Sequence, residues 1–197
     1  MNGAFHVPVY FDYIATFAWA LSGAIVGLRK HFDIVGVFVL ALLTSVGGSI
    51  LRDGLFLQRT PPVLTDPVYL PLITLATLLI ALLHRRIADL PMVDKLVSTI
   101  DAIGTPAFAV VGMQLALGAG IPLPGVVLVG AVSGVGGGVL RDVIVRDVPF
   151  ILQPGQFFAL VVLLASLVFL ALTLALGVDT VPAAWATIAL FFVVRML

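Results

Sequence analysis

The chain has no cysteine and no glutamate, and only two of its 197 residues are lysine. Without cysteine there is no disulfide bond, no thiolate metal site and no thiol nucleophile. Charged residues make up 10% of the chain, whereas a soluble domain carries about 25%. Such a sequence cannot build a water-facing shell, so we exclude a soluble globular protein. Because the net charge is zero and no basic patch is present, nucleic acid is not an expected partner.

Signatures of intramembrane enzymes are also missing from the sequence. It has no Gly-x-Ser-Gly site with a histidine inside a span, and no His-Glu-x-x-His motif, which would need glutamate. The three histidines fall at the edges of predicted spans, where a solvated histidine is ordinary. We therefore predict neither an enzyme nor a bound metal.

Hydrophobic residues account for 61% of the chain, and apolar segments recur along most of its length. A helix needs about 20 apolar residues to cross a bilayer, and seven such segments lie between breaks rich in glycine, proline and charge. This pattern predicts an all-α membrane protein with a single transmembrane domain over residues 1–197. The predicted spans are residues 7–28, 34–57, 68–83, 96–117, 123–145, 157–176 and 181–194.

Basic residues are distributed unequally between the two predicted sides of the membrane. Eight lie around the ends of the first, third and fifth spans or at the C-terminus, and two lie on the other side. Lysine and arginine are in excess in cytoplasmic loops. We therefore expect the N-terminus outside and the C-terminus in the cytoplasm.

The sequence aligns with itself at an offset of 89 residues, which pairs Asp12 with Asp101 and Thr16 with Thr105. Each copy contains three spans, an odd number, so the second copy enters the membrane from the opposite side. This predicts two inverted three-helix repeats, residues 7–88 and 96–177, followed by a seventh helix within 181–197. The alternative is an ancient duplication that was kept for packing alone.

The second helix of each repeat carries the motif Gly-Gly-x-x-Leu-Arg-Asp. Each glycine weakens a helix by about 1 kcal/mol relative to alanine. We therefore expect a kink or a broken turn, more distorted in the copy with three glycines. The alternative role is close packing, because rows of small residues let helices approach one another. The predicted pore hinges are Gly47, Gly48, Ser49, Gly136, Gly137 and Gly138.

Six charged residues recur at equivalent positions of the two repeats. A charge at mid-membrane costs at least about 2.5–3.5 kcal/mol, so it normally faces a partner or water. Adjacent helical residues point about 100° apart, so each arginine need not bind the aspartate that follows it. We expect pairing across the repeats or with the first-helix aspartates; the alternative is snorkelling at helix ends. The predicted pore-lining or gating charges are Arg52, Asp53, Arg141, Asp142, Asp12 and Asp101, and the predicted pore hydroxyls are Thr16, Thr105 and Ser133.

The two inverted repeats and the doubled motif, from about Tyr10 to Arg195, resemble the trimeric intracellular cation (TRIC) channel family. More specifically, the chain is similar to the small bacterial membrane proteins classified as UPF0126 or "glycine transporter" type. The resemblance implies a homotrimer with a hydrophilic pore in each protomer and pore helices, the second and fifth, kinked at their glycines. It implies that monovalent cations, chiefly K⁺ together with Na⁺, pass through.

The same resemblance implies a prokaryotic cytoplasmic (inner) membrane, with membrane lipids as partners and bound lipid as the only further ligand. Arg52 and Arg141 stand where animal members carry a lysine-based motif. The main alternative is a secondary transporter of glycine or another small solute, built on the same inverted repeat. A third reading is a membrane scaffold that transports nothing.

Overall fold

The computed structural model describes residues 8–83, 93–153 and 158–196, and in these ranges every regular element is helical. Four helices are long and apolar enough to cross a membrane, and three more are shorter and apolar. The main helices are α1 (Tyr10–Arg29), α2 (Ile34–Leu51), α3 (Tyr69–Leu82), α5 (Val93–Gly118), α6 (Leu123–Ile144), α7 (Phe158–Leu170) and α8 (Thr180–Met196). Two π turns extend α2 and α7, namely η1 (Arg52–Phe56) and η4 (Ala171–Ala175).

Each predicted span coincides with one of these helices, and the largest difference in the described part lies at the start of α5. This helix begins at Val93, three residues before the predicted start. Asp94 and Lys95 look like loop residues in the sequence, but an aspartate in the first turn favours a helix N-terminus. Val7, Phe157 and residues 84–88 of the first predicted repeat lie outside the described residues.

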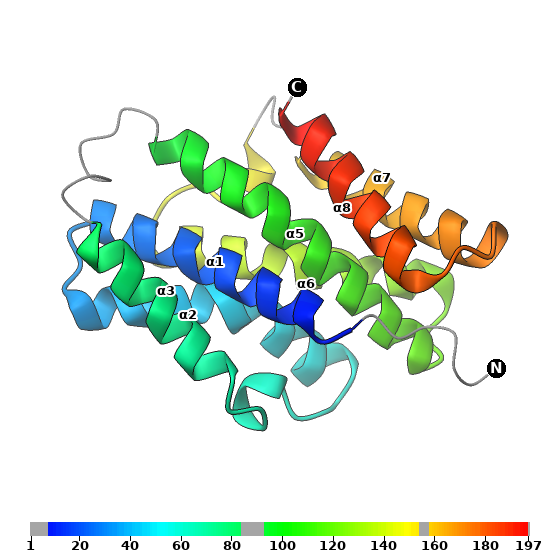
Figure 1. Ribbon diagram of the computed structural model, residues 1–197, viewed down its shortest axis with the longest axis horizontal. Coiled ribbons are helices and arrows are strands. Elements are labelled where there is room, and N and C mark those ends of the chain that lie inside the picture. The colour runs from blue at the N-terminus through cyan, green and yellow to red at the C-terminus, as the bar shows by residue number, and fades with distance from the viewer. Residues whose placement is uncertain (1–7, 84–92, 154–157, 197) are drawn as a thin grey trace.

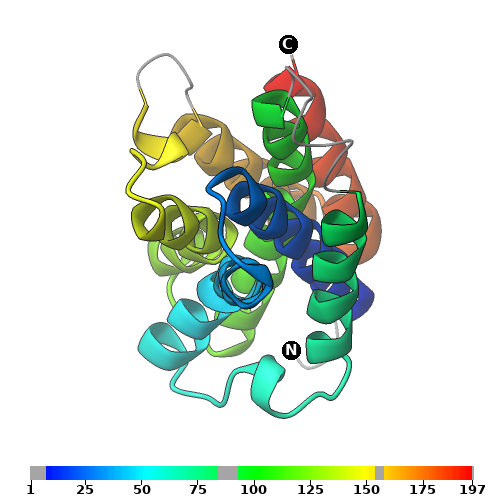
Figure 2. The same ribbon diagram turned by 90° about the vertical axis from the view of Figure 1, so that its left-hand side faces the viewer.

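Helices α1 and α5 run through the middle of the molecule and pack against each other (Figure 1). Helices α2 and α3 pack against α1, helices α6, α7 and α8 pack against α5, and α2 also packs against α6. Figure 2 shows the same arrangement turned by 90°, with α7 near the top of the view and α3 at the lower right. Three apolar clusters fill the interior of the described part. One lies between α1, α2, α3 and the start of α5, one between α1, α5, α6, α7 and α8, and a smaller one between α5, α7 and α8.

The glycine motifs do not break their helices. Helix α2 is α-helical through Gly47 and Gly48, and α6 is α-helical through Gly136–Gly138 to its end at Ile144. The prediction of a broken turn at the glycines is therefore wrong, whereas a kink there, larger in the three-glycine copy, stays a prediction. The departure from α-geometry is the π turn η1, which begins at Arg52, beyond the glycines.

The glycines instead allow α2 and α6 to cross in close contact. A Cβ atom added at Gly48 would overlap the carbonyl oxygen of Ser133, and one added at Gly137 would overlap the carbonyl oxygen of Thr44. Later residues of each helix thus face earlier residues of the other, so the two helices are antiparallel. The close contact explains why both helices stay α-helical at their glycines. Packing against the neighbouring backbone outweighs the low helix propensity of glycine.

Candidate functional site

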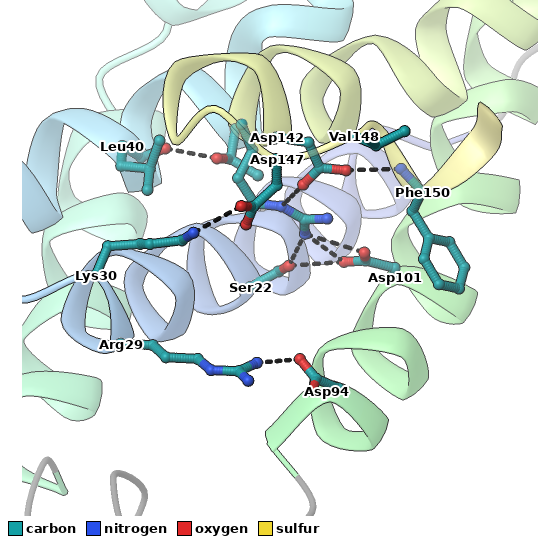
Figure 3. Close-up of polar contacts among 12 residues, drawn as sticks. Ser22, Arg29, Lys30, Leu40, Asp94, Asp101, Asp142, Asp147, Val148 and Phe150 are labelled. Carbon is teal, nitrogen blue, oxygen red and sulfur yellow. Dashed lines mark hydrogen bonds and ion pairs between the residues drawn. The ribbon is translucent and has the colours of Figure 1, made fainter. Parts of the chain in front are cut away.

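Four buried polar residues form the first candidate site, which we call the Asp101 cluster: Ser22, Asp101, Arg141 and Asp142. Arg141 donates from Nε to Asp142 Oδ1 at 2.8 Å and from Nη1 to Asp101 Oδ2 at 3.0 Å. Ser22 lies between the opposite charges, donating to Asp101 Oδ1 at 2.7 Å and accepting from Arg141 Nη1 (Figure 3). Arg141 is 3% exposed and Asp101 is 4% exposed. The arginine is thus held inside the protein by two carboxylates and a hydroxyl.

Two further contacts hold this cluster in place. The Arg141 guanidinium carbon lies 5.7 Å from the centre of the Trp19 ring, within cation–π range. Asp142 Oδ2 accepts a hydrogen bond from the backbone N–H of Phe150 at 2.9 Å. Trp19 is 2% exposed, so its large apolar surface shields the cluster rather than facing lipid.

The second candidate site, the Asp12 cluster, contains Asp12, Arg52, Asp53 and Tyr69. Arg52 binds Asp53 in a bidentate manner, with Nε and Nη2 each 2.8 Å from a carboxylate oxygen. Arg59, from the following loop, donates to Asp53 Oδ1 at 2.8 Å. The Tyr69 hydroxyl donates to Asp12 Oδ2, while Asp12 Oδ1 lies 4.0 Å from Arg52 Nη1. Arg52 and Asp53 are fully buried.

The observed pairing decides between the alternatives for the six charges. Each arginine binds the aspartate that follows it, and it faces the aspartate from the first helix of its own repeat. Of the two expected pairings, the one with the first-helix aspartates is observed, and these residues form no ion pair across the repeats. The contacts between the repeats come from Ser22 and from the Trp19 ring. Snorkelling is also wrong, because a guanidinium buried this deeply needs carboxylate partners rather than bulk water.

The two clusters lie on opposite sides of the crossing between α2 and α6. Arg52 follows the Gly47–Gly48 pair, and Arg141 follows the Gly136–Gly137 pair, by four to five residues. At 1.5 Å per residue each arginine is about 7 Å beyond the crossing, and the helices run in opposite directions. The molecule therefore has one charge cluster toward each end.

The three hydroxyls predicted near the charges are buried and unpartnered. Thr16 and Thr105 are fully buried and Ser133 is 1% exposed, yet none of the three has a hydrogen-bond partner among the described residues. By contrast, Thr44 and Ser49 donate to carbonyl groups of their own helix, at 2.6 and 2.8 Å. Thr16 and Thr105 each lie about one helical turn after Asp12 and Asp101, in α1 and α5. These hydroxyls are therefore placed between the two clusters.

A cavity of about 680 Å³ leads from the surface to the Asp101 cluster, and Asp101, Arg141 and Asp142 belong to its lining. Two ion pairs lie at its rim, where the end of α1 meets the start of α5 and the segment after α6. Arg29 binds Asp94, and Lys30 Nζ lies 2.7 Å from Asp147 Oδ1 (Figure 3). The charged lining comprises three basic residues, Arg29, Lys30 and Arg141, and four acidic ones, Asp94, Asp101, Asp142 and Asp147. Within the described residues no group of histidine, cysteine and acidic side chains is suited to hold a metal ion.

Sequence reasoning missed three side chains that complete the clusters, namely Ser22, Tyr69 and Arg59. The 89-residue offset pairs Ser22 with Val111, so comparison of the two repeats does not single out Ser22. Tyr69 is a plain aromatic residue at a helix start, and Arg59 is a loop residue. Their contacts with Asp12 and Asp53 arise only from the way the chain returns from α2 into α3.

The fold and its buried arginine–aspartate clusters define a helical membrane protein of the TRIC cation channel class. A solved TRIC cation channel, described for the structural basis of conductance, is 33% identical, with a TM-score of 0.82 over 98% of this chain and 92% of that one. The TRIC orthologue from Rhodobacter sphaeroides is 28% identical, with a TM-score of 0.86 over 95% of this chain and 94% of that one. A prokaryotic TRIC channel solved in 0.5 M KCl is 29% identical, with a TM-score of 0.84 over the same shares.

The family model described as "Glycine transporter" matches residues 9–85 and again residues 98–173. The chain belongs to this family. A UPF0126 membrane protein of Deinococcus radiodurans is 41% identical over 71% of this chain and 64% of the relative, so the match spans somewhat less than two thirds of that protein. The UPF0126 inner membrane protein YadS of Escherichia coli is 32% identical over 73% of this chain and 69% of the relative.

Proposed function

We propose that the protein is a channel for monovalent cations, K⁺ and Na⁺, with a hydrophilic pore in each protomer of a homotrimer. The observation that carries this proposal is the set of buried, unpartnered hydroxyls between two arginine–aspartate clusters. Hydroxyls buried without a partner are costly in an apolar interior, and they become favourable where a hydrated ion passes. The likeness to solved TRIC channels over nearly the whole chain supports the same class.

The proposed path begins at the 680 Å³ cavity and reaches the Asp101 cluster. It then follows the free hydroxyls of Thr105, Ser133 and Thr16 and leaves through the Asp12 cluster. The repeated set of two aspartates and one arginine has a formal charge of −1 in each cluster. Arg59 offsets this charge at the Asp12 cluster, so the preference for cations over anions comes from the Asp101 cluster. Buried and paired as they are, Arg141 and Arg52 close the path, so we assign them as gates rather than as ion-binding groups.

We further propose that residues 7–88 and 96–177 are inverted repeats. The overlaps at the helix crossing support this arrangement, because Gly48 meets Ser133 just as Gly137 meets Thr44, and both pairs are related by the 89-residue offset. The two family-model matches also begin 89 residues apart. In this architecture the crossing of α2 and α6 is the pivot of the pore, and the glycine motif with Ser49 and Gly138 serves as its hinge on opening.

The proposed location is a bacterial inner membrane, with the N-terminus outside and the C-terminus in the cytoplasm. The relatives are named as membrane proteins, and YadS as an inner membrane protein. The cavity with Lys30 and Arg29 at its rim then opens to the cytoplasm, consistent with the excess of positive charge on that side. Lipids surround the apolar helices and are the expected bound ligands, and no chemical reaction is assigned to the protein.

A carrier for glycine or another small solute is the second candidate, and the name of the matching family favours it. The cavity that leads to the Asp101 cluster offers both carboxylates and cationic groups, which a zwitterionic amino acid requires. A carrier gives saturable uptake without unitary currents, whereas a channel gives discrete conductance steps. A scaffold gives neither.

Reconstitution of the purified protein into planar bilayers under a KCl gradient tests the channel. We expect unitary currents that reverse near the K⁺ equilibrium potential. Replacing both Asp12 and Asp101 with asparagine should move the reversal potential toward zero, since cation preference falls. Asp179→Asn, at an exposed position between α7 and α8, is the matched control and should leave it unchanged. An unchanged reversal potential in the double variant would contradict the role of the two aspartates.

A further inference from the structure

The two clusters share their repeated residues but differ in how completely these are bound. In the Asp101 cluster the arginine reaches the first-helix aspartate directly, with Arg141 Nη1 at 3.0 Å from Asp101 Oδ2. In the Asp12 cluster the corresponding gap, Arg52 Nη1 to Asp12 Oδ1, is 4.0 Å. Both atoms of this second pair are buried and have no hydrogen-bond partner among the described residues. Arg52 binds Asp53 through two hydrogen bonds, so the looser contact of the Asp12 cluster is the one between its arginine and its first-helix aspartate.

The Ser22 hydroxyl accounts for the closer contact between arginine and aspartate in the Asp101 cluster. Ser22 donates to Asp101 Oδ1 at 2.7 Å and accepts from Arg141 Nη1, so it links the carboxylate to the guanidinium. Ser22 comes from α1, whereas Asp101 and Arg141 come from α5 and α6. It is fully buried, so water does not replace it freely. The hydroxyl therefore ties the first repeat to the charge pair of the second.

The 89-residue offset pairs Ser22 with Val111. A valine side chain neither donates nor accepts a hydrogen bond. Tyr69 partly compensates by donating to Asp12 Oδ2, but Asp12 Oδ1 and Arg52 Nη1 stay unpartnered. The serine–valine difference thus coincides with the difference between the clusters.

We propose that Ser22 is a positioning residue that makes the Asp101 cluster the tighter of two gates, so that access to the centre of the protein is asymmetric. The path is open more often on the side of the Asp12 cluster, and movement of the Asp101 cluster limits passage. This inference rests on the proposed pore, but the access difference is measured without any current.

The natural absence of cysteine makes an accessibility experiment direct. Single cysteines at Thr16 and at Thr105 place one thiol behind each cluster. A charged, membrane-impermeant methanethiosulfonate is added to right-side-out or inside-out vesicles, and the labelling rates are compared. We expect Thr16→Cys, approached from the Asp12 side, to react about tenfold faster than Thr105→Cys approached from the Asp101 side, the ratio set by one hydrogen-bonded link to charged groups. Equal rates would overturn the proposal.

Exchanging the two equivalent residues identifies the cause. In the Thr105→Cys background Ser22→Val should raise labelling from the Asp101 side about tenfold, whereas Ser22→Thr, which keeps the hydroxyl, should restore the slow rate. In the Thr16→Cys background Val111→Ser should slow labelling from the Asp12 side. An unchanged rate in Ser22→Val, or the same rate in Ser22→Thr as in Ser22→Val, would refute the role of the hydroxyl.

Two controls keep the outcome decisive. Each variant is first checked for a monodisperse oligomer, and if Ser22→Val fails to fold, Val111→Ser still tests the proposal at the other cluster. Single-channel recording then separates this inference from the channel itself. If the protein conducts but Ser22→Val opens as often as the wild type, the role of Ser22 is refuted. If the labelling rates are as expected but the wild-type protein gives no current, the proposal that the protein is a channel is refuted.

Discussion

A substitution of Gly137 by alanine should destabilise the protein through the crossing of α2 and α6. The added Cβ would overlap the carbonyl oxygen of Thr44, and a backbone carbonyl inside a helix cannot rotate away. Alanine recovers about 1 kcal/mol of helix propensity, but overpacking of this kind costs typically 1–3 kcal/mol and more when backbone must shift. Because the obstacle here is backbone, the upper part of that range applies, and we expect a net loss of about 2 kcal/mol.

The structure supplies a graded series for this prediction. Gly118, at the end of α5, has no atom within 4 Å of an added Cβ, so Gly118→Ala is the matched control and should be neutral or slightly stabilising. At Gly136 the nearest atom is the Gly48 Cα at 3.1 Å, so Gly136→Ala should fall between the two. Gly48→Ala should resemble Gly137→Ala, because it meets the carbonyl oxygen of Ser133 in the same way.

Thermal unfolding in detergent, followed by circular dichroism, measures the series. For a chain of this length each kcal/mol moves the melting temperature by about 2–4 °C, so Gly137→Ala should melt about 4–8 °C below Gly118→Ala. If Gly137→Ala melts with Gly118→Ala, the crossing is not tight and the packing role of the glycines is refuted. If instead Gly136→Ala is the most destabilised, the register of the two helices differs from the one described.

Two further predictions concern charge. Asp53→Asn removes the carboxylate that Arg52 and Arg59 share. We expect it to lower the free energy of unfolding by about 3–5 kcal/mol and to give a low yield of folded protein in size-exclusion chromatography. As a control, Arg59→Gln, at a side chain that is 39% exposed, should lower it by no more than about 1 kcal/mol. The hydrogen bond from Tyr13 lowers the pKa of Asp66, in the loop before α3, below its ordinary value of 3.8. The hydrogen-bonded Asp66 carboxylate therefore adds stability that is fully present above pH 3.8 and is lost as the pH falls through the lowered pKa. The melting temperature of Tyr13→Phe should lie below that of the wild type, and the difference should disappear only under strongly acidic conditions.

The sequence predicted the helices, and it singled out the six charges that turn out to be buried, because both leave direct traces in composition. In a chain with so few charged residues, six that recur at the 89-residue offset are conspicuous, and all six are buried in the two clusters. The partners of these charges were harder to find, because a partner needs only to be near in space. Ser22 and Tyr69 come from other helices, and neither is repeated at its equivalent position, which is Val111 in the case of Ser22.

The broken turn expected at the glycine motif was wrong for a different reason, while the alternative of close packing describes the crossing. Helix propensity describes an isolated helix, and by that measure Gly47–Gly48 and Gly136–Gly138 are weak points. The structure places the two weak points against each other, where the absence of side chains is what permits contact. Small-residue rows predict such packing in principle, but which helix supplies the opposite face is a tertiary fact that no local pattern contains.

The antiparallel crossing also explains why one motif can serve both ends of the molecule. If two helices cross at their glycines and run in opposite directions, an arginine–aspartate pair placed one turn after the glycines in each helix must lie at opposite ends. The duplicated motif therefore produces two similar clusters, one toward each end. If the two clusters had identical residues and contacts, the two ends of the molecule would be equivalent. A protein that treats its two sides differently must then use residues that escape the repeat. Ser22, Tyr69 and Arg59 are cluster residues that the repeat does not share, so under the proposed asymmetry they are the positions to test.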